Sequence, residues 1–192
     1  CDWGYAESAD GRHWVKKGRL SKLGGVEDCH VVHDRQAGRY CMYYWDRAHE
    51  KTGKALFVAE SADETHFDFA AARKVTIEGE QYPCFYKFSH VIQADGGWHM
   101  FYANFKRPGC ADALTRYATS PDGLNWKKVN GNLLAGMDGE VLPLADDLYL
   151  MYYCPAGHFD QDDCDIRLAI FGGSLKDLAA ARPGPGPGET GR

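Results

Sequence analysis

Short runs of β-branched and aromatic residues, separated by turns that contain Asp and Gly, recur along most of the chain. In three places an aliphatic run that opens on His or Glu leads through such a turn into an aromatic run, at 30–44, 90–102 and 140–153. Runs of this composition, bounded by these turn residues, predict β-hairpins. No helical periodicity of useful length is present, so we expect an all-β chain.

A second motif ends a strand in each of these units. It reads Ala-x-Ser-x-Asp-[Gly/Glu]-x-x-[Trp/Phe] at 6–14, 59–67 and 118–126, with a degenerate copy at 169–175. The four serines are 53, 59 and 54 residues apart, which indicates a repeated structural unit. Because Asp can accept hydrogen bonds from backbone N–H groups two residues on, and Gly permits a positive φ, we interpret the motif as a structural turn.

Each full repeat predicts an inner strand, an aromatic strand, a strand that ends at the Ser, and an outer strand led by the Trp. Four-stranded antiparallel blades of this kind, arrayed about an axis, form a β-propeller. The predicted domain, 1–178, holds an outer half blade at about 3–20 and nearly complete blades at about 25–75, 83–129 and 136–178. We expect a flexible Pro/Gly tail at 179–192. Since four blades is the smallest usual ring, we also expect the ring to be incomplete and the chain truncated.

Composition and charge exclude several classes of partner. The chain has 192 residues, of which 44% are hydrophobic and 26% charged, as is typical of a globular domain. Its 22 basic and 27 acidic residues give a net charge of −5, so no overall basic field would attract nucleic acid or an anionic membrane. No apolar run reaches the roughly 18–20 residues of a membrane span. We therefore expect no nucleic-acid partner and no membrane partner.

The seven cysteines are scattered and include no Cys-x-x-Cys pair. This pattern does not indicate a disulfide framework, and it favours a cytoplasmic setting. The nearest approach to a metal-binding cluster runs from Cys154 to Asp165, with His158 and several Asp between them. Its spacing fits neither a zinc ribbon nor a calcium loop, so we expect an acidic loop there, with no metal and no cofactor.

The motifs together resemble the five-bladed propeller superfamily of glycoside hydrolase families 43 and 32, with the related family 130 mannoside phosphorylases. The resemblance rests on the Ser-x-Asp-Gly-x-x-Trp turns, on two Tyr-x-Met-Tyr-Tyr strands, and on Val26-Glu27-Asp28-Cys29-His30-Val31, which is similar to the family's V-x-D-P-x-V opening of an inner strand. It covers about 175 of the 192 residues. The chain departs from the family at Cys29, where Pro is usual, and we expect the family's first blade, which often carries a catalytic carboxylate, to be missing.

The resemblance implies that inner strands line a central pocket, with side chains alternating between the two faces of each strand. Alignment on Val31, Val91 and Val141 gives two rows of equivalent positions. One row holds Asp28, Phe88 and Asp138, and the row two residues on holds His30, His90 and Glu140. Alternation predicts that both rows share the pocket face. Glycoside cleavage requires two carboxyl groups, one to protonate the leaving oxygen and one to act as base or nucleophile.

We assign candidate roles on this basis. Asp28, at the matching position of the family motif, is the candidate base, nucleophile or substrate-orienting carboxylate. Glu140 is the candidate general acid, and Asp138 competes for that role. For each of these carboxylates the alternative is an ordinary turn or loop residue.

The remaining candidates would bind substrate. His30 and His90 could bind sugar hydroxyls or tune a carboxylate, or could be partly buried histidines satisfied by the backbone. Trp45, Arg47 and Asn104 follow the aromatic strands and are candidates to border the pocket mouth, where an aromatic ring stacks on a sugar and Arg holds an anion.

The resemblance implies a glycoside hydrolase-like protein that cleaves an oligosaccharide or polysaccharide with paired carboxylates. Three alternatives stay open. A glycoside phosphorylase would need cations for phosphate, for which the candidates are Arg47, Lys87, Lys106 and Arg107. A non-catalytic propeller would bind carbohydrate or protein. The third alternative is a sialidase-like propeller, because the motif is similar to an Asp box. It ranks last, since the motif is one residue shorter than that box and no Arg triad is evident.

Overall fold

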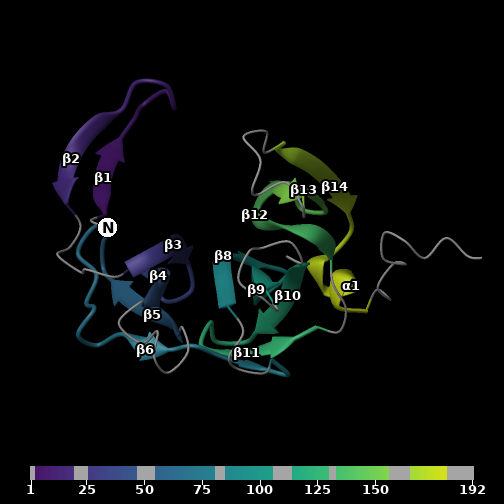
Figure 1. The fold of residues 1–192 in the computed structure, drawn as a ribbon. Helices are drawn as coiled ribbons and strands as arrows, with labels where there is room; N and C mark the ends of the chain where they lie inside the picture. The colour runs from purple at the N-terminus through teal and green to yellow at the C-terminus, as the bar shows by residue number, and fades with distance from the viewer. Residues whose placement is uncertain are drawn as a thin grey trace, which may run out of the picture.

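The computed structural model describes residues 3–19, 26–46, 55–80, 85–105, 114–129, 133–155 and 165–180. Within these ranges the chain forms fourteen β-strands and one six-residue helix, which confirms the all-β prediction. No helix among the described residues is long and apolar enough to cross a membrane. The strands build successive antiparallel blades in an arc (Figure 1).

The N-terminal hairpin and the first blade follow the predicted order. The hairpin pairs β1 (Gly4–Glu7) with β2 (Val15–Arg19). The first blade is a sheet with the order β3 (Val26–Asp34), β4 (Arg39–Asp46), β5 (Ala55–Ser61) and β6 (Arg73–Lys74). Its outer strand is short and comes later than the motif alone predicts, because residues 66–72 form no strand.

The second blade has four antiparallel strands and one addition at its outer edge. Its strands are β8 (Phe85–Ala94), β9 (Gly97–Phe105), β10 (Leu114–Ser120) and β11 (Asn125–Lys128). The connecting strand β7 (Thr76–Glu78) pairs in parallel with β11. This pairing covers the edge of the blade, which would otherwise present unpaired backbone groups.

The third blade differs from the four-stranded prediction. It consists of β12 (Leu134–Ala145), β13 (Leu148–Pro155) and β14 (Arg167–Gly172), followed by the helix α1 (Leu175–Ala180) in place of an outer strand. The degenerate fourth motif lacks the Asp-Gly turn and the Trp, and Leu175 instead buries its side chain completely against the blade. The predicted domain end at 178 therefore falls inside the helix, and 181–192 lies outside the described residues.

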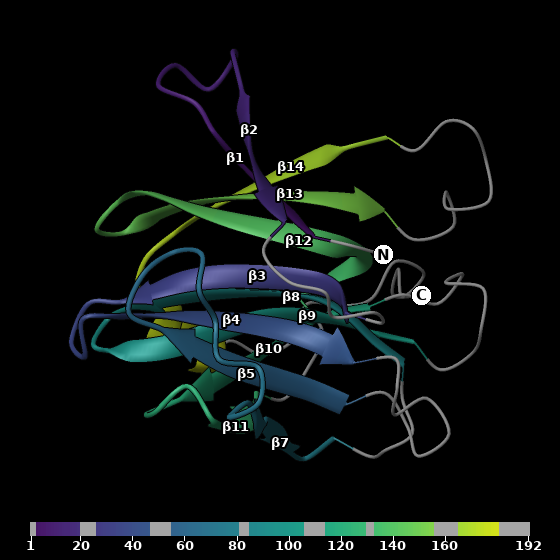
Figure 2. The same cartoon turned by 90° about the vertical axis from the view of Figure 1, so that its left-hand side faces the viewer.

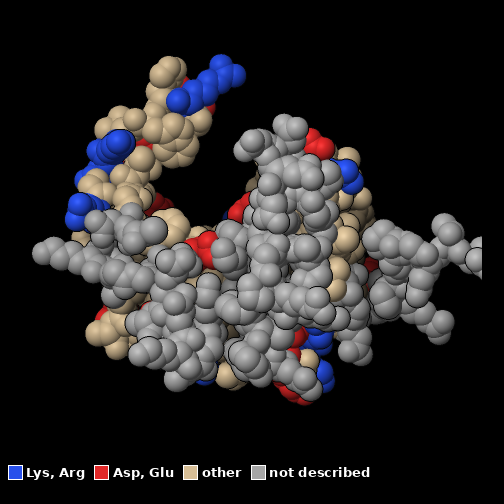
Figure 3. Space-filling model, viewed as in Figure 1, with Lys and Arg blue, Asp and Glu red and all other residues tan. Residues whose placement is uncertain are grey.

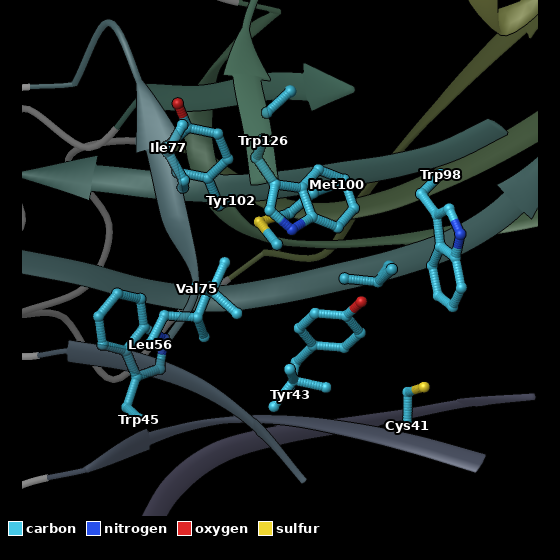
Figure 4. Packing of buried hydrophobic residues seen from close by; sticks show 13 residues of the cluster. Cys41, Tyr43, Trp45, Leu56, Val75, Ile77, Trp98, Met100, Tyr102 and Trp126 are labelled. Atoms are coloured by element: carbon cyan, nitrogen blue, oxygen red, sulfur yellow. The ribbon is translucent and has the colours of Figure 1, made fainter. Parts of the chain in front are cut away.

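The blades are held together by side chains from both faces of the aromatic strands. Tyr43 and Trp45 of β4 pack with Trp98 of β9 and Trp126 of β11 in one buried cluster between the first two blades (Figure 4). In β9, Met100 belongs to this cluster, whereas its neighbour Phe101 belongs to the cluster between the second and third blades. Consecutive side chains of a strand point to opposite faces of its blade. Because the second blade packs against a neighbour on each face, β9 is hydrophobic at consecutive positions.

The arc leaves one blade face open. Apolar side chains on the far face of the third blade are exposed, namely Leu142, Leu144, Leu148, Tyr152, Leu168 and Ile170. Among the described residues no further blade covers this face (Figure 2). In the space-filling view a hollow separates the third blade from the hairpin, whose Lys and Arg are exposed (Figure 3). Trp14 of the hairpin is 60% exposed, whereas the equivalent Trp126 is 2% exposed. The described part is therefore an incomplete ring, as predicted.

Candidate functional site

The three inner strands carry the same irregularity at the same place. Their pairing with the second strand of each blade shifts between Glu27 and His30, between Lys87 and His90, and between Met137 and Glu140. In each case the inner strand advances by three residues while its partner advances by two, so the inner strand holds one extra residue, which defines a β-bulge. The first paired residues after the bulges are His30, His90 and Glu140, so these positions are structurally equivalent, as the alignment predicted.

The bulge corrects the expectation that Asp28 shares a face with His30. That expectation assumed uninterrupted alternation, but an extra residue lies between the two positions, and Asp28 has a left-handed backbone with φ of 49°. Asp28 is half-buried and precedes the stretch of β3, from His30 onward, that lines the central cavity, while Cys29 packs on the cluster of Met42 and Tyr44. Asp138 occupies the corresponding part of β12, and its side chain lies outside the description.

The residues that follow the bulges meet across the three blades. The ring centroids of His30 and His90 are 4.1 Å apart. Nδ1 of His90 lies 2.5 Å from Oε2 of Glu140. His30 Nε2 lies 3.0 Å from the carbonyl oxygen of Val91 and must donate to it, because a carbonyl only accepts. Two imidazoles and one carboxylate therefore form a continuous line from β3 through β8 to β12.

Burial and neighbouring groups shift the pKa values of His30 and Glu140. His90 is 6% exposed, whereas Glu140 is exposed. Burial, and next the neighbouring His90, lower the pKa of His30 to about 4, which keeps its ring neutral at neutral pH. The contact with His90 lowers the pKa of Glu140 although desolvation opposes it. A general acid needs a raised pKa, so this environment does not support the general-acid role expected for Glu140.

A cavity of about 670 Å³ lies beside these residues, between the three inner strands. His30 and His90 line it, and its wall continues through the turns that end β3, β8 and β12. At the turn end, Gln93 donates from Nε2 to buried Asp34 at 3.0 Å, which ties the first two blades together. The volume is in the range of pockets that hold small ligands.

The other predicted binding residues do not join this group. Trp45 is 2% exposed in the core between the blades, so the prediction that it stacks on a sugar is wrong, because packing takes the whole indole. Asn104 pairs through its backbone with Tyr86 and Leu114, and its side chain is not described. Arg47 lies outside the described residues, as do the phosphate candidates Lys106 and Arg107, while Lys87 lacks a described side chain.

The cysteines also depart from expectation. Cys154 is disulfide-bonded, although the sequence pattern did not indicate disulfides. Among the other described cysteines, Cys29 and Cys41 are free. The acidic loop that was weighed as a metal cluster falls mostly in 156–164, which is also outside the description.

The pattern of residues does not by itself show that His30, His90 and Glu140 form one set of donors. Their alignment in one row predicts sugar-binding and acid–base roles for the separate residues. Their identity as two imidazoles and one carboxylate was the available signal. Only the contacts between blades show that these groups approach one another.

Comparison with known proteins places the fold. No family model and no curated protein matches the sequence. Among solved structures, a thermostable family-43 glycoside hydrolase aligns with a TM-score of 0.62 at 18% identity, covering 82% of this chain and 58% of its own. The Bombyx mori GH32 β-fructofuranosidase BmSUC1 aligns at 0.58 and 11% identity, covering 91% and 40%.

A third solved structure is that of a deacetylase and not of a glycoside hydrolase. An N-acetylgalactosamine deacetylase from F. plautii, in complex with blood group B trisaccharide, aligns with a TM-score of 0.58 at 11% identity. The alignment covers 92% of this chain and 59% of that one. The chain thus spans between 40% and 59% of the length of these three structures. Because the identities are this low, the similarity shows the fold alone: this chain is a β-propeller, similar in fold to a family-43 glycoside hydrolase and to a GH32 β-fructofuranosidase.

Proposed function

We propose that the chain is part of a glycoside hydrolase-like propeller that cleaves glycosidic bonds of an oligosaccharide or polysaccharide at the centre of the ring. The observation that carries this proposal is the convergence of three equivalent inner-strand positions beside one central cavity. The β-propeller fold of its structural neighbours supports it. Bulges are frequent next to active sites, where they re-aim side chains, and here all three precede the converging residues.

Asp28, Glu140 and Asp138 are the carboxyl groups in this proposal. Hydrolysis requires one of them to deliver a proton to the leaving oxygen and another to act as base or nucleophile. Since Glu140 contacts His90, we assign it to the side that accepts a proton or orients substrate, and we assign the proton donor to one of the two aspartates. His30 and His90 would bind sugar hydroxyls at the cavity wall.

A panel of aryl glycosides and oligosaccharides, assayed with the longest natural protein that contains this sequence, tests the proposal. We expect Asp28→Asn and Glu140→Gln to lower kcat/KM by at least about 100-fold, since each removes a group that acts in the transition state. Asp138→Asn tests the remaining candidate. The matched control is Asp147→Asn, at an exposed turn, and we expect it to leave the rate unchanged.

Two results would overturn the proposal. Equal hydrolysis by the wild type and all three site variants would show that these carboxylates are not catalytic. Saturable glycan binding without hydrolysis, weakened by His90→Gln, would indicate a non-catalytic carbohydrate-binding propeller.

A carbohydrate deacylase is the second candidate. It is favoured by the composition of the cluster, in which a carboxylate meets two imidazoles and not a second described carboxylate. The solved structure described as an N-acetylgalactosamine deacetylase supports including it. Acetate release from N-acetylated sugars, with no glycosidic cleavage, would identify this activity in the same assay.

A further inference from the structure

The central cluster contains a buried ring nitrogen that contacts a carboxylate without a well-directed hydrogen bond. Nδ1 of His90 is buried and makes no well-directed hydrogen bond among the described residues. Its close neighbour is Oε2 of Glu140, at 2.5 Å. Buried polar atoms normally make well-directed contacts, and a cation between this nitrogen and this oxygen would satisfy both atoms.

The surrounding donors have the geometry of a cation site. One ligand atom each from His30, His90 and Glu140 lie within 4.8 Å of one another. First-row transition cations bind imidazole nitrogen and carboxylate oxygen at about 2.0–2.2 Å, so a single ion can reach three donors at such separations after small side-chain rotations. Two imidazoles favour zinc, nickel, copper or iron over calcium, which prefers six to eight oxygen ligands.

The fold also orients these donors. The three residues stand at equivalent positions after the bulges of β3, β8 and β12, so the backbone fixes their starting points. His30 is held through Nε2 on the carbonyl oxygen of Val91, which leaves Nδ1 with its lone pair. A backbone carbonyl that holds the second nitrogen is the usual support of a metal-binding histidine.

One side of the cluster remains accessible. The Glu140 side chain is 63% exposed, and His30 and His90 line the central cavity. Three protein donors with an accessible fourth position are the arrangement of reactive metal sites, whereas structural zinc sites use four protein ligands.

We propose that His30, His90 and Glu140 form a three-ligand site for a divalent first-row transition cation, with a fourth position open to water or a substrate oxygen in the central cavity. This site goes beyond the proposed glycosidase activity and does not depend on it. A bound cation would occupy Glu140, so the carboxyl groups left for glycosidic chemistry would be Asp28 and Asp138.

Metal binding by the chelator-treated chain, measured without any carbohydrate, tests the site. Zn²⁺ is titrated in competition with a chromophoric chelator, and Co²⁺ is followed by visible absorption, which reports coordination number and ligand type. We expect one ion per chain, and at least tenfold weaker binding for His90→Gln and for Glu140→Gln. The control variant is His33→Gln, an exposed histidine on β3 whose ring stacks on Tyr40, and its affinity should be unchanged.

Circular dichroism of each variant without metal verifies that its fold is retained. Should His90→Gln not fold, Glu140→Gln, which changes an exposed side chain, carries the test alone. Three results would overturn the proposal: no Zn²⁺ binding at millimolar concentration, unchanged affinity in folded site variants, or a Co²⁺ spectrum with thiolate charge-transfer bands. None of these results would affect the glycosidase proposal, because no sugar is present.

Discussion

The aspartate of the repeated turn motif shows how one residue determines local structure. Asp122 Oδ1 accepts hydrogen bonds from the backbone N–H groups of Leu124 and Asn125, at 2.9 and 2.8 Å. Trp126 donates from its indole nitrogen to the carbonyl oxygen of Gly123 at 3.0 Å. Asp10 makes the same pair of backbone contacts in the first copy. The structural interpretation of the motif is therefore confirmed, and it follows from turn chemistry that is local in sequence.

We expect Asp122→Ala to lower the free energy of unfolding at pH 7 by about 1–2 kcal/mol, because it removes an acceptor from the turn. Partial burial acts to raise the pKa of Asp122, but the hydrogen bonds from Asn125 and Leu124 outweigh it, and the net pKa lies below the usual value of about 3.9. A lowered pKa in the folded state stabilises the fold above pH 4, and this contribution is lost as the pH falls below that value.

Urea unfolding at pH 7 and at pH 3 measures this effect. The difference between wild type and Asp122→Ala should narrow at pH 3, whereas Asp147→Asn, at an exposed turn, should unfold like the wild type at pH 7. A difference that stays the same or grows on acidification would contradict the role of the ionised carboxylate.

Gly123 gives a second test at the residue scale. Its φ is +73°, and an added Cβ would lie 2.7 Å from the hydroxyl oxygen of Tyr43 and 3.2 Å from the Trp98 ring. We expect Gly123→Ala to cost about 2–4 kcal/mol, from the left-handed backbone and from overpacking between the blades. Gly38 has a φ of +63° and no atom near the added Cβ, so Gly38→Ala should cost only about 1 kcal/mol. Equal losses in thermal or urea unfolding would show that the blade contact contributes nothing.

At the scale of elements, α1 depends on the neighbouring blade. A six-residue helix is too short to be stable by itself. Asp95, in the turn between β8 and β9, accepts hydrogen bonds from Ser174 Oγ at 2.7 Å and from the Leu175 backbone N–H at 2.8 Å. Tyr117 of β10 donates to the carbonyl oxygen of Leu175 at 2.9 Å. These bonds and the burial of Leu175 hold a helix where the repeat predicted a strand.

Asp95→Ala should therefore weaken α1 more than the rest of the blade. We expect a loss of about 1–2 kcal/mol in the free energy of unfolding, the usual effect of removing a cap, and faster hydrogen exchange at the α1 amides. Asp177→Asn, an exposed first-turn residue of α1, is the control and should have a smaller effect. Unchanged exchange in α1 after Asp95→Ala would show that packing alone holds the helix.

At the scale of the whole molecule, the main feature is the exposed apolar face of the third blade. Leu168 and Ile170 are 48% and 64% exposed, whereas Ala169 between them packs toward the second blade. Exposed apolar areas of this kind bind hydrophobic dyes. We expect the double substitution Leu168→Lys and Ile170→Lys to reduce 1-anilinonaphthalene-8-sulfonate fluorescence and to change the free energy of unfolding by less than about 0.5 kcal/mol.

The matched control for the open face is Ala169→Lys. It places a charge in the packed interface and should destabilise the chain by more than about 2 kcal/mol without removing the exposed apolar side chains. If the double variant were as destabilised as Ala169→Lys, the face would be buried in solution, and the open arc would be wrong.

The sequence by itself determined the features that depend on short spacings. Alternating and aromatic runs predicted the hairpins, the Ser-x-Asp-Gly-x-x-Trp copies predicted the turns, and their recurrence predicted the blades. The equivalence of His30, His90 and Glu140 also came from alignment of the repeats. The hairpins and turns follow from turn chemistry and strand periodicity within about ten residues, where local sequence dominates. The blades and the equivalent positions follow from the repetition of these local units along the chain.

The tertiary structure decided what depends on groups distant in the chain. The bulge at Asp28 interrupts the alternation of side chains along β3. The sequence could not predict it, because a single extra residue leaves no periodic signal. Trp45 entered the core, since the packing of the second blade takes its whole indole. His30, His90 and Glu140 became one cluster only when three strands, each some fifty to sixty residues apart, met at the centre of the ring. Contacts between blades, and not the local pattern, set the composition of the site.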